Sequence, residues 1–426
     1  MEALMSMEEA LERMLSHFHT LEAEDTSIMD TLGQVLAKDL YASFDVPPMD
    51  NSAMDGYAVR VSDTKGAAAN SPVNLDIIGQ VAAGHLPDAE VRRGTAIRIM
   101  TGAPIPKGAD AVVPFEDTDE VQQREDMPAS ARLSRIRVFK EPKGEANIRR
   151  AGGDVKAGTL VLSAGTNIRP SEIGVIATLG MASVAVYRRP KVGILATGDE
   201  LVEPGQPLGP GEIYDANSYS IASQVRQCGG VPVLLGIARD TIDELMAKIG
   251  TGLSMDFLIT SAGVSTGEYD LVKDILTEYG WMDFWRVRMR PGKPIAFGTL
   301  KAPDGRDIPH MGLPGNPVSS MVAFEQFARP AIMKMLGHED KSRLIISAVV
   351  EQKVVNDDGR RFFARAIISK RNGEYYARLT GPQGSNIITS MSKANGLLII
   401  PEDVTVVNPG DRVQVQVLAG SEDLLA

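Results

Sequence analysis

Cysteine is almost absent from the sequence, which has one, Cys228, among 426 residues. A single cysteine cannot form an intramolecular disulfide, and the histidines and Cys228 show no spacing typical of a zinc site. The sequence therefore predicts a protein of a reducing compartment, the cytoplasm. Cys228 itself is expected to be a small buried apolar residue.

Positive charge is also scarce. Lys and Arg number 44 while Asp and Glu number 55, so the formal net charge is −11. Nucleic-acid binding without sequence preference and docking on anionic lipid both need an excess of positive charge. We therefore expect no nucleic-acid partner and no membrane partner, and an anionic ligand would need a local basic patch.

Long apolar runs are missing as well. The longest uncharged apolar-rich run, residues 173–187, is interrupted by Gly174 and Gly180 and falls short of the roughly 20 residues that span a bilayer. Residues 1–5 lack the basic start and the apolar core of a secretory signal. The sequence thus predicts neither a membrane span nor a secretory signal.

The length and the changes of pattern predict a multi-domain fold, α/β plus β. A chain of 426 residues is long enough for about three domains. Residues 1–55 and 138–189 are expected to form one mixed domain, into which a β-rich domain, residues 56–137, is inserted. Strands and helices alternate over residues 190–340, which predicts a parallel sheet. Residues 341–426 indicate a small all-β domain.

Local patterns predict the individual elements. Ser6 and Glu9 form a capping box that starts a helix, and Asn372-Gly373 between apolar runs predicts a hairpin. Residues 117–131 are expected to be a loop or a mobile hairpin. The expected helices cover residues 26–40, 171–179, 217–227, 241–250, 271–279 and 318–336, and the expected strands cover residues 73–78, 95–100, 111–115, 191–196, 231–237 and 257–260.

Polar loops follow the strands of the α/β region, at residues 197–201, 238–240, 260–270 and 312–319. Open parallel sheets bind ligands at the carboxyl ends of their strands. Acidic residues in three of these loops can converge on Mg²⁺, which prefers carboxylate oxygens. Asp240 could equally cap the helix that follows it. These acids are Asp199, Glu200, Asp240, Glu268 and Asp270.

The last two of these loops are rich in Gly and Ser, and the last one opens a helix, whose exposed N–H groups favour an anion such as phosphate. An ordinary turn is the alternative interpretation of either loop. Neither contains G-x-G-x-x-G or a P-loop, which disfavours a Rossmann dehydrogenase and a Walker ATPase. Metal and phosphate together predict phosphoryl chemistry by positioning and charge neutralisation, without a protein nucleophile.

Basic residues gather in two places. One is Arg149-Arg150, and the other is Arg286, Arg288 and Arg290, which a continuous strand would place on one face. A solvated face is the ordinary explanation of such a stripe. The rigid turn that follows would fix Lys293, which favours an anion-binding role instead.

The segment Asp50–Val59 joins two carboxylates and a small turn directly after Pro47-Pro48, so its acids are expected on a braced, accessible loop. It resembles the signature of the molybdopterin molybdenumtransferases, the family of bacterial MoeA and the gephyrin E domain. Other stretches also carry the resemblance, and they occur along the chain in the same order as in the family. They are residues 45–47, 98–104, 147–150 with 153–154, 197–201, 263–270, 291–294 and 312–319.

The resemblance implies an elongated chain with a MogA-like α/β molybdopterin-binding domain, a β-rich inserted domain, a mixed N-terminal linker domain and a small β-barrel-like C-terminal domain. It implies insertion of molybdate into adenylylated molybdopterin with cleavage of the pterin–AMP anhydride, which releases molybdenum cofactor and AMP. It further implies magnesium as the divalent metal, a homodimer, and a molybdopterin adenylyltransferase and molybdoenzymes as partner proteins.

Matched position by position, the resemblance also implies site residues. The catalytic residues would be Asp55, Asp154, Glu200, Asp240 and Asp270, of which Glu200, Asp240 and Asp270 would also hold the metal. The substrate-binding residues would be Thr101, Arg149, Ser265, Arg286, Arg290, Lys293, Pro314, Gly315, Asn316, Arg365 and Ser385.

The sequence departs from the family pattern at Arg286 and Arg290, where some relatives carry Lys, and at Ala262, where Gly is common. Arg binds oxyanions in a bidentate manner whereas Lys is a compact charge, so the geometry of the basic stripe could differ. A gephyrin-like scaffold and a pterin adenylyltransferase are the alternative functions. The retained acids, and a chain expected to begin at the capping-box helix, favour the molybdenum-inserting enzyme, and we expect activity to be retained.

Overall fold

The structure is a computed structural model that describes residues 4–125, 133–239, 241–261, 280–418 and 420. The chain forms two compact units, each described by itself below. The first unit comprises Met1–Ala37, Gly165–Arg169 and Ser183–Ala426, and the second comprises Lys38–Ala164 and Pro170–Ala182. No helix in the described ranges is long and apolar enough to cross a membrane.

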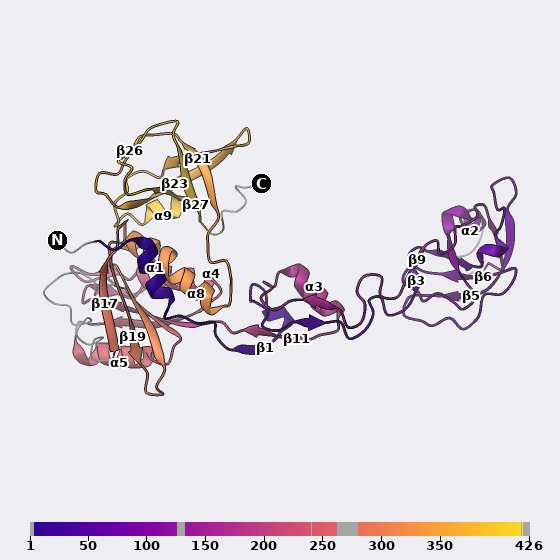
Figure 1. Cartoon of the computed structure of the whole chain (residues 1–426), viewed down its shortest axis with the longest axis horizontal. Helices are drawn as coiled ribbons and strands as arrows, with labels where there is room; N and C mark the ends of the chain where they lie inside the picture. Colours follow the sequence, from indigo (N-terminus) through magenta and orange to yellow (C-terminus); the bar gives the residue numbers. More distant parts are fainter. Residues whose placement is uncertain (1–3, 126–132, 240, 262–279, 419, 421–426) are drawn as a thin grey trace. The chain divides into compact units, whose positions relative to one another are not determined.

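A six-stranded sheet forms the centre of the first unit, with the strand order β15-β12-β16-β20-β19-β17 (Figure 1). The first four strands run parallel, whereas β19 and β17 are antiparallel additions at one edge. The predicted parallel α/β domain is therefore confirmed, with a mixed edge. The strands are β12 (Lys191–Thr197), β15 (Val231–Ala238), β16 (Phe257–Ser261), β17 (Gly280–Arg286), β19 (Pro294–Lys301) and β20 (Asp307–Leu313).

Helices cover both faces of this sheet. Helices α1, α4, α7 and α8 pack on one face and α5 packs on the other, so the inner strands β12 and β16 are buried on both sides. The predicted helices over residues 217–227 and 241–250 are confirmed, and the one over residues 271–279 lies outside the described residues. The bounds are α4 (Asn217–Gln227), α5 (Ile242–Gly252), α7 (Pro317–Ala323), the π-helical η4 (Phe324–Ala328) and α8 (Arg329–Met335).

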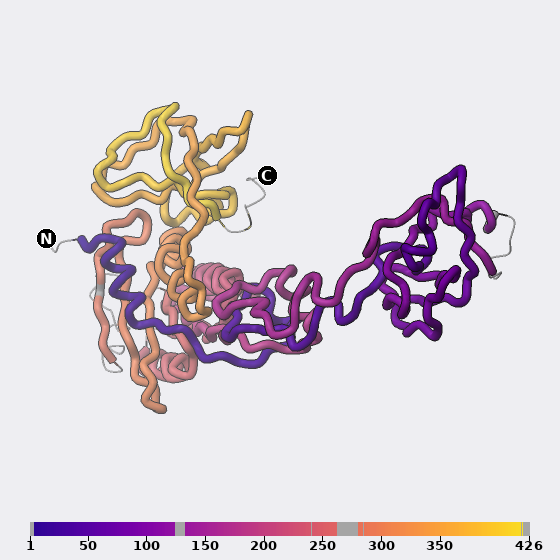
Figure 2. Tube along the Cα trace, turned by 45° about the vertical axis from the view of Figure 1, so that its right-hand side comes forward, coloured from indigo at the N-terminus to yellow at the C-terminus, as the bar shows by residue number. Residues whose placement is uncertain are grey.

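Helix α1 (Met7–Leu15) belongs to the core of the α/β domain. The Ser6 hydroxyl accepts a hydrogen bond from the Glu9 N–H at 3.1 Å, which confirms the predicted capping box. Met14 is buried among the sheet and helix residues, and the Phe18 ring lies 4.9 Å from that of Phe257. Figure 2 shows α1 running along this domain. Helix α1 therefore packs against the sheet of the first unit.

The predicted helix over residues 26–40 is wrong. The segment contains part of β1 (Ala23–Ser27), a single 3₁₀ turn η1 (Ile28–Asp30), and β2 (Leu40–Tyr41). Strand β1 pairs with β11 (Ser183–Tyr187). Gly33 has φ +77°, a left-handed conformation that a continuing helix cannot contain. The apolar residues that suggested a helix lie instead on extended backbone, where Val35 and Leu36 are buried.

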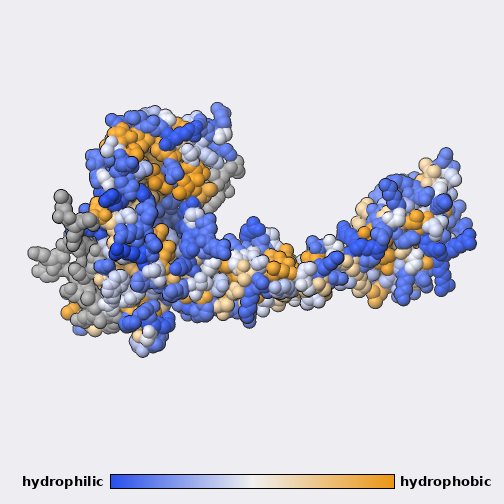
Figure 3. All heavy atoms as spheres, viewed as in Figure 1, coloured by the Kyte–Doolittle hydropathy of each residue, from blue (hydrophilic) through white to orange (hydrophobic). Residues whose placement is uncertain are grey.

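The C-terminal part of the first unit is a closed five-stranded barrel, because β25 pairs back to β23 in the order β23-β24-β21-β27-β25. The β-barrel-like expectation is confirmed. Asn372 and Gly373 have φ +51° and +79°, so the predicted hairpin turn between β23 and β24 forms. Figure 3 shows apolar atoms on the barrel surface, where Ile345 and Val355 are exposed. Its elements are β21 (Ile345–Val350), β22 (Val354–Val355), β23 (Arg361–Arg371), β24 (Glu374–Leu379), α9 (Thr389–Lys393), β25 (Gly396–Ile400), β26 (Val406–Val407) and β27 (Arg412–Val417).

The second unit contains a five-stranded sheet in the order β7-β4-β6-β5-β8, so the predicted β-rich region is observed. Part of the expected loop over residues 117–131 is instead helix α2 (Glu120–Glu125), and residues 126–132 lie outside the described residues. The remaining bounds are β3 (Asn51–Ser52), β4 (Gly56–Val59), η2 (Val61–Asp63), β5 (Val73–Val81), β6 (Thr95–Ile99), β7 (Ala111–Pro114), η3 (Phe115–Asp117), β8 (Arg135–Val138), β9 (Ile148–Arg149), β10 (Leu160–Leu162) and α3 (Pro170–Thr178).

Candidate functional site

A cavity of about 120 Å³ lies at the carboxyl ends of the parallel strands. Glu200 lines it after β12, Ser261 at the end of β16, and Gly315 after β20. Asp215 and Asn217 line it from the segment that leads into α4. The cavity is thus where an open parallel sheet is expected to bind a ligand.

Gly198 allows the first loop to bring Glu200 to this cavity. Its φ of +142° is a conformation that side chains rarely adopt, and a Cβ on it would lie 2.4 Å from a Glu200 carboxylate oxygen. The Glu200 side chain therefore folds back over the glycine. Two short parallel strands, β13 (Leu201–Val202) and β14 (Ile213–Tyr214), hold the rest of the loop.

Asn217 and Asp215 are cavity residues that sequence reasoning missed. The Asn217 side-chain amide donates to the Ser261 hydroxyl at 2.7 Å and to the Gly315 carbonyl at 2.8 Å, which links the ends of two strands. Asp215 accepts from the Ser218 N–H at 3.0 Å, and its other oxygen has no hydrogen-bond partner among the described residues. The available signal was an acid just before a predicted helix, which indicates only a cap.

The predicted metal set is only partly visible. Asp240, Asp270 and the predicted substrate residue Ser265 lie outside the described residues, which leaves Glu200. Within the described ranges no group of three or more His, Cys, Asp or Glu residues could hold a metal ion. Glu200 and Asp215 nevertheless give the cavity carboxylate oxygens, the hard donors that suit Mg²⁺.

The predicted continuous basic strand is wrong. Strand β17 ends at Arg286, and β18 (Met289–Arg290) pairs with β23 of the barrel, so the chain passes from one sheet to another. The alternation survives in the burial: Val287 and Met289 are buried, whereas Arg286 and Arg288 are exposed. The strand is interrupted because residues 289–290 pair with the barrel instead of continuing β17. In the parallel register of β18 with β23, Arg290 lies opposite Phe362.

Arg290 and Lys293 differ in their surroundings. The Arg290 guanidinium lies 4.5 Å from the centroid of the Phe362 ring and 3.5 Å from a carboxylate oxygen of Asp358. Lys293 is half-buried, and its ammonium group has no ion-pair partner in the described part of the chain. The basic segment therefore retains a cation, Lys293, that no acid of the described residues neutralises.

Arg365 is a fully buried cation on β23. Its Nε donates to the Ser390 hydroxyl at 3.1 Å and one terminal nitrogen donates to the Gly384 carbonyl at 3.0 Å. The other terminal nitrogen has no partner among the described residues. Burial, with a smaller contribution from the Arg290 charge, lowers the pKa of Arg365 to about 10, so the group stays charged at neutral pH. This is an arrangement that an anion would stabilise.

Ser385 connects the barrel to the last sheet-end loop. Its carbonyl accepts the Val318 N–H at 3.1 Å. That N–H opens α7, so one donor expected to face an anion is already used. The Asn316 side chain makes no capping bond, and it is exposed together with Gly315, whereas Pro314 is buried. The Val318 contact therefore places Ser385 at the start of α7, two residues after Asn316.

In the second unit, Asp55 and Thr101 form a direct pair. One Asp55 oxygen accepts the Thr101 N–H at 2.7 Å and the Thr101 hydroxyl at 2.8 Å. These two bonds hold the pKa of Asp55 below its ordinary value, and the charge of Arg98 adds to the effect. Asp55 is exposed, so its carboxylate remains accessible.

Backbone pairing holds Arg149 beside Asn51, four residues before Asp55. Strand β3 pairs with β9, and the Gly102 N–H donates to the Ser52 carbonyl at 2.8 Å. The Arg149 side chain is exposed and has no ion pair within the described residues. Its neighbour Arg150 instead pairs with Asp50 and Glu145.

Asp154 lies in a separate hollow of the same unit. It is exposed and lines a cavity of about 480 Å³ formed by residues 152–156 and 159–161. Its N–H donates to the Val46 carbonyl at 3.0 Å, which ties it to the segment that precedes Asp55. The predicted residues of this unit therefore lie on segments joined by backbone hydrogen bonds.

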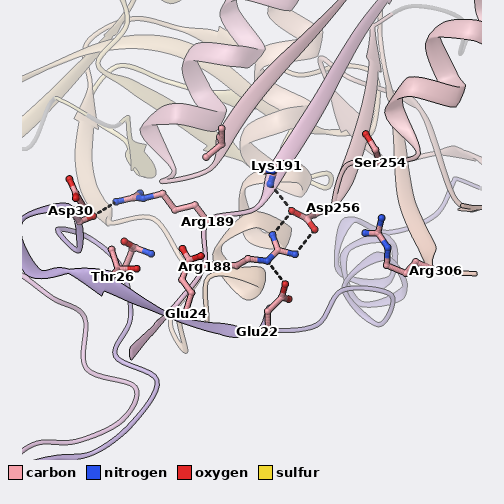
Figure 4. Close-up of a pocket in the computed structure, with 12 residues that line it drawn as sticks. Glu22, Glu24, Thr26, Asp30, Arg188, Arg189, Lys191, Ser254, Asp256 and Arg306 are labelled. Carbon is pink, nitrogen blue, oxygen red and sulfur yellow. Dashed lines mark hydrogen bonds and ion pairs between the residues drawn. The ribbon is translucent and has the colours of Figure 1, made fainter. Parts of the chain in front are cut away.

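A cavity of about 590 Å³ at the amino ends of the parallel strands has a different character (Figure 4). Arg188 donates to both oxygens of Asp256, at 2.6 Å each, and pairs with Glu22. Arg189 donates to the Gly229 and Leu32 carbonyls, at 3.0 Å each. Its arginines are thus occupied, and they tie the β1–β11 ribbon to the sheet. We interpret this cavity as structural.

Comparison with known proteins gives the family. The MoeA N-terminal region, domains I and II, matches residues 5–180, a probable molybdopterin-binding domain matches residues 193–334, and the MoeA C-terminal region, domain IV, matches residues 347–418. Molybdopterin molybdenumtransferase 2 of Mycobacterium tuberculosis is 38% identical over 390 residues, which cover 90% of this chain and 92% of the relative. The chain belongs to the MoeA family of molybdopterin molybdenumtransferases. The resemblance inferred from the sequence motifs is therefore confirmed.

Other members of the family show the same extent of similarity. The molybdopterin molybdenumtransferase of Haemophilus influenzae is 35% identical, over 97% of this chain and 98% of its own length. A crystal structure of the Pyrococcus horikoshii MoeA protein matches with a TM-score of 0.79 at 32% identity, covering 98% of this chain and 100% of that one. The MoeA fold thus extends over nearly the whole chain.

Proposed function

We propose that this chain inserts molybdate into adenylylated molybdopterin, cleaves the pterin–AMP anhydride, and releases molybdenum cofactor and AMP. Membership of the MoeA family supports this proposal, since its relatives carry the name molybdopterin molybdenumtransferase. The observation that carries it is Arg365, a buried guanidinium whose free nitrogen lacks a partner among the described residues. An oxyanion such as molybdate or phosphate could accept a hydrogen bond from that nitrogen and balance the charge of the guanidinium group.

Arg290, Lys293 and Arg365 would bind the anionic parts of the substrates. Arg365 and Arg290 come from neighbouring strands, and the Arg290 charge contributes to lowering the pKa of Arg365, so the two cations lie close enough to act on one anion. Lys293 adds a charge that no described acid neutralises. The further substrate contacts in this proposal are Thr101, Arg149, Ser265, Arg286, Pro314, Gly315, Asn316 and Ser385.

Magnesium is part of the proposal, with Glu200, Asp240 and Asp270 as its ligands. When bound, Mg²⁺ would neutralise negative charge on the phosphates of the anhydride. The carboxylates at the carboxyl ends of the strands are of the right chemical type, and Glu200 is exposed to the cavity. Replacing Asp240 or Asp270 with Ala should impair turnover and leave folding intact. Unchanged turnover would remove these residues from the site.

The remaining catalytic acids in the proposal are Asp55 and Asp154. Both are exposed carboxylates, and the Thr101 bonds keep Asp55 ionised to lower pH than an ordinary aspartate. We further propose a cytoplasmic homodimer that receives its substrate from a molybdopterin adenylyltransferase and passes its product to molybdoenzymes. Light scattering of the purified chain tests the dimer, and a monomeric mass would contradict it.

Incubation of the purified protein with adenylylated molybdopterin, magnesium and molybdate tests the function. AMP should appear with molybdate and stay near the background without it. Sulfate, an anion of similar shape, serves as the control for a general anion effect. A gephyrin-like scaffold without activity would give no AMP under either condition.

A further inference from the structure

The helix that follows the Pro314–Asn316 loop contains an unusual interruption. Between α7 and α8 the chain forms the π-helical segment η4 (Phe324–Ala328). Such segments are rare inside helices and frequently lie at functional sites. Glu325, in this segment, is a buried acid that no part of the proposed chemistry uses.

Glu325 joins three parts of the first unit. One of its oxygens accepts from Arg343 Nε at 2.5 Å, from the Gln416 amide at 3.4 Å, and lies 3.2 Å from Arg329 Nε. Arg343 belongs to the connector that leads into the barrel, and Gln416 belongs to barrel strand β27. Arg329 also donates to the Lys341 carbonyl of that connector. The helix, the connector and the barrel therefore meet at one carboxylate.

The charges make this junction depend on Glu325. One carboxylate faces two guanidinium groups, of which Arg329 is buried and Arg343 nearly so. Burial lowers the pKa of Arg329 while the Glu325 charge acts in the opposite direction. Without the carboxylate, the Arg329 and Arg343 guanidinium groups would both lose the acid that lies within 3.2 Å of each, which is strongly unfavourable for partly desolvated cations.

The same helix touches the barrel at the proposed site. At its start, the Val318 N–H donates to the Ser385 carbonyl at 3.1 Å, and at η4 the Gln326 amide donates to the Gln416 side chain at 2.9 Å. The two contacts are roughly 12 Å apart along the helix at the usual rise per residue. The helix is thus fixed to the barrel at two points, one of them beside the anion-binding residues.

We propose that Glu325 is a positioning residue for the reaction: its junction with Arg343 and Gln416 sets the barrel, which carries Arg365 and Ser385, against the loop Pro314–Asn316. This rests on the proposed function only for its effect on turnover. Its structural part, the dependence of the Val318–Ser385 contact on Glu325, stands on the geometry alone.

Glu325→Gln is the direct test, because it keeps the shape and removes the charge. The KM for molybdate should rise about tenfold, while kcat should change less than about threefold, since the chemical groups are intact. Amide exchange at Val318 should become at least about tenfold faster, because the Ser385 carbonyl is no longer held against it. Exchange in the barrel core, as at Ala366, should not change.

Asp256→Asn is the matched control. It makes the same carboxylate-to-amide change at a similarly buried acid that is bonded to an arginine, 7% exposed against 6% for Glu325. Asp256 lies at the opposite end of the sheet, at the structural cavity. Its variant should lose stability yet keep the KM for molybdate and the Val318 exchange rate.

Arg343→Gln keeps the proposal testable if Glu325→Gln does not fold. It leaves the Glu325–Arg329 pair in place and removes the bond from Arg343 to Glu325, while the Arg329 bond to the Lys341 carbonyl stays. The same rise in KM and faster Val318 exchange are expected. Unchanged KM and exchange in a folded variant would overturn the proposal. If the wild-type protein releases no AMP, the function fails, and the exchange experiment alone decides the role of Glu325.

Discussion

The Asp55 carboxylate accepts two hydrogen bonds from Thr101, one from its N–H at 2.7 Å and one from its hydroxyl at 2.8 Å. The residues are 46 positions apart, and the sheet of the second unit brings them together. The carboxylate is held in one orientation while it remains exposed. An acid with a fixed direction suits a reaction that depends on positioning.

Thr101→Val should weaken activity without unfolding the protein. It removes the hydroxyl bond and keeps the N–H bond, so we expect kcat/KM to fall about tenfold, and about a hundredfold for Asp55→Asn. Steady-state AMP release measures both. Thr64→Val, which removes a hydroxyl bond to the Val61 carbonyl in the same unit, is the control and should leave kcat/KM unchanged. Equal rates for Thr101→Val and wild type would exclude the proposed role of this bond.

Arg365→Lys should raise the KM for molybdate about tenfold. Lysine keeps the charge, but it cannot make the bonds to Ser390 and Gly384 and also present a free N–H to an anion. Molybdate titration in the AMP-release reaction gives the value. Arg378→Lys, an exposed residue on the neighbouring strand β24, is the matched control. A KM that is the same in all three proteins would remove Arg365 from the anion site.

His310 should make the protein less stable in mild acid. Burial lowers the pKa of His310 to about 3, and its Nε2 lies 3.1 Å from the Thr260 hydroxyl. The folded value is below that of the unfolded chain, about 6.5. Between these two values the unfolded state binds the extra proton, so the free energy of unfolding should fall by up to about 1.4 kcal/mol per pH unit as pH decreases.

His310→Gln should remove this pH dependence, since glutamine does not titrate. Urea unfolding at pH 7, 6 and 5 should give a shallower slope for the variant than for the wild type. If the two slopes are the same, His310 is not the group responsible. For each protein, the free energy of unfolding at pH 7 is the value from which its loss of stability at pH 6 and pH 5 is measured.

Asp256→Asn should cost about 3 kcal/mol of unfolding free energy, because it leaves the largely buried Arg188 with a broken pair. Burial acts to raise the pKa of Asp256, but the bonds from Arg188 and the Lys191 N–H outweigh it and hold the pKa below its ordinary value. The stabilisation is therefore present above the unfolded pKa and is lost as pH falls through the folded one. Denaturant unfolding at neutral pH checks the magnitude, and a loss under 1 kcal/mol would contradict it.

Much of the fold follows from local sequence patterns. The capping box at Ser6, the helix Asn217–Gln227 and the Asn372-Gly373 turn form as predicted, because each depends on a few neighbouring residues. Residues 26–40 show why local patterns fail. Their apolar spacing suits a helix, but pairing with distant residues such as Val186 fixes extended backbone instead.

The site is predictable where the motif residues lie within one segment, and less so where distant segments meet. The family resemblance predicts Asp55, Thr101 and Arg365 as site residues, yet nothing local shows that Asp55 and Thr101 bond directly or that Arg365 is buried. Arg290 illustrates the limit from the other side. Alternation correctly predicts that Arg286 and Arg288 are exposed, but not that Arg290 packs on Phe362 or that the chain changes sheets there. Asp215 was missed because its only local signal is that of a helix cap.

Molybdate-dependent release of AMP from adenylylated molybdopterin by the purified protein tests the central claim most directly. With magnesium present, AMP formation should increase at least about tenfold when molybdate is added, and sulfate should not replace it. Arg365→Lys should need more molybdate to reach the same rate. AMP release that is absent, or that proceeds equally well without molybdate, would contradict the assignment of this chain as a molybdenum-inserting enzyme.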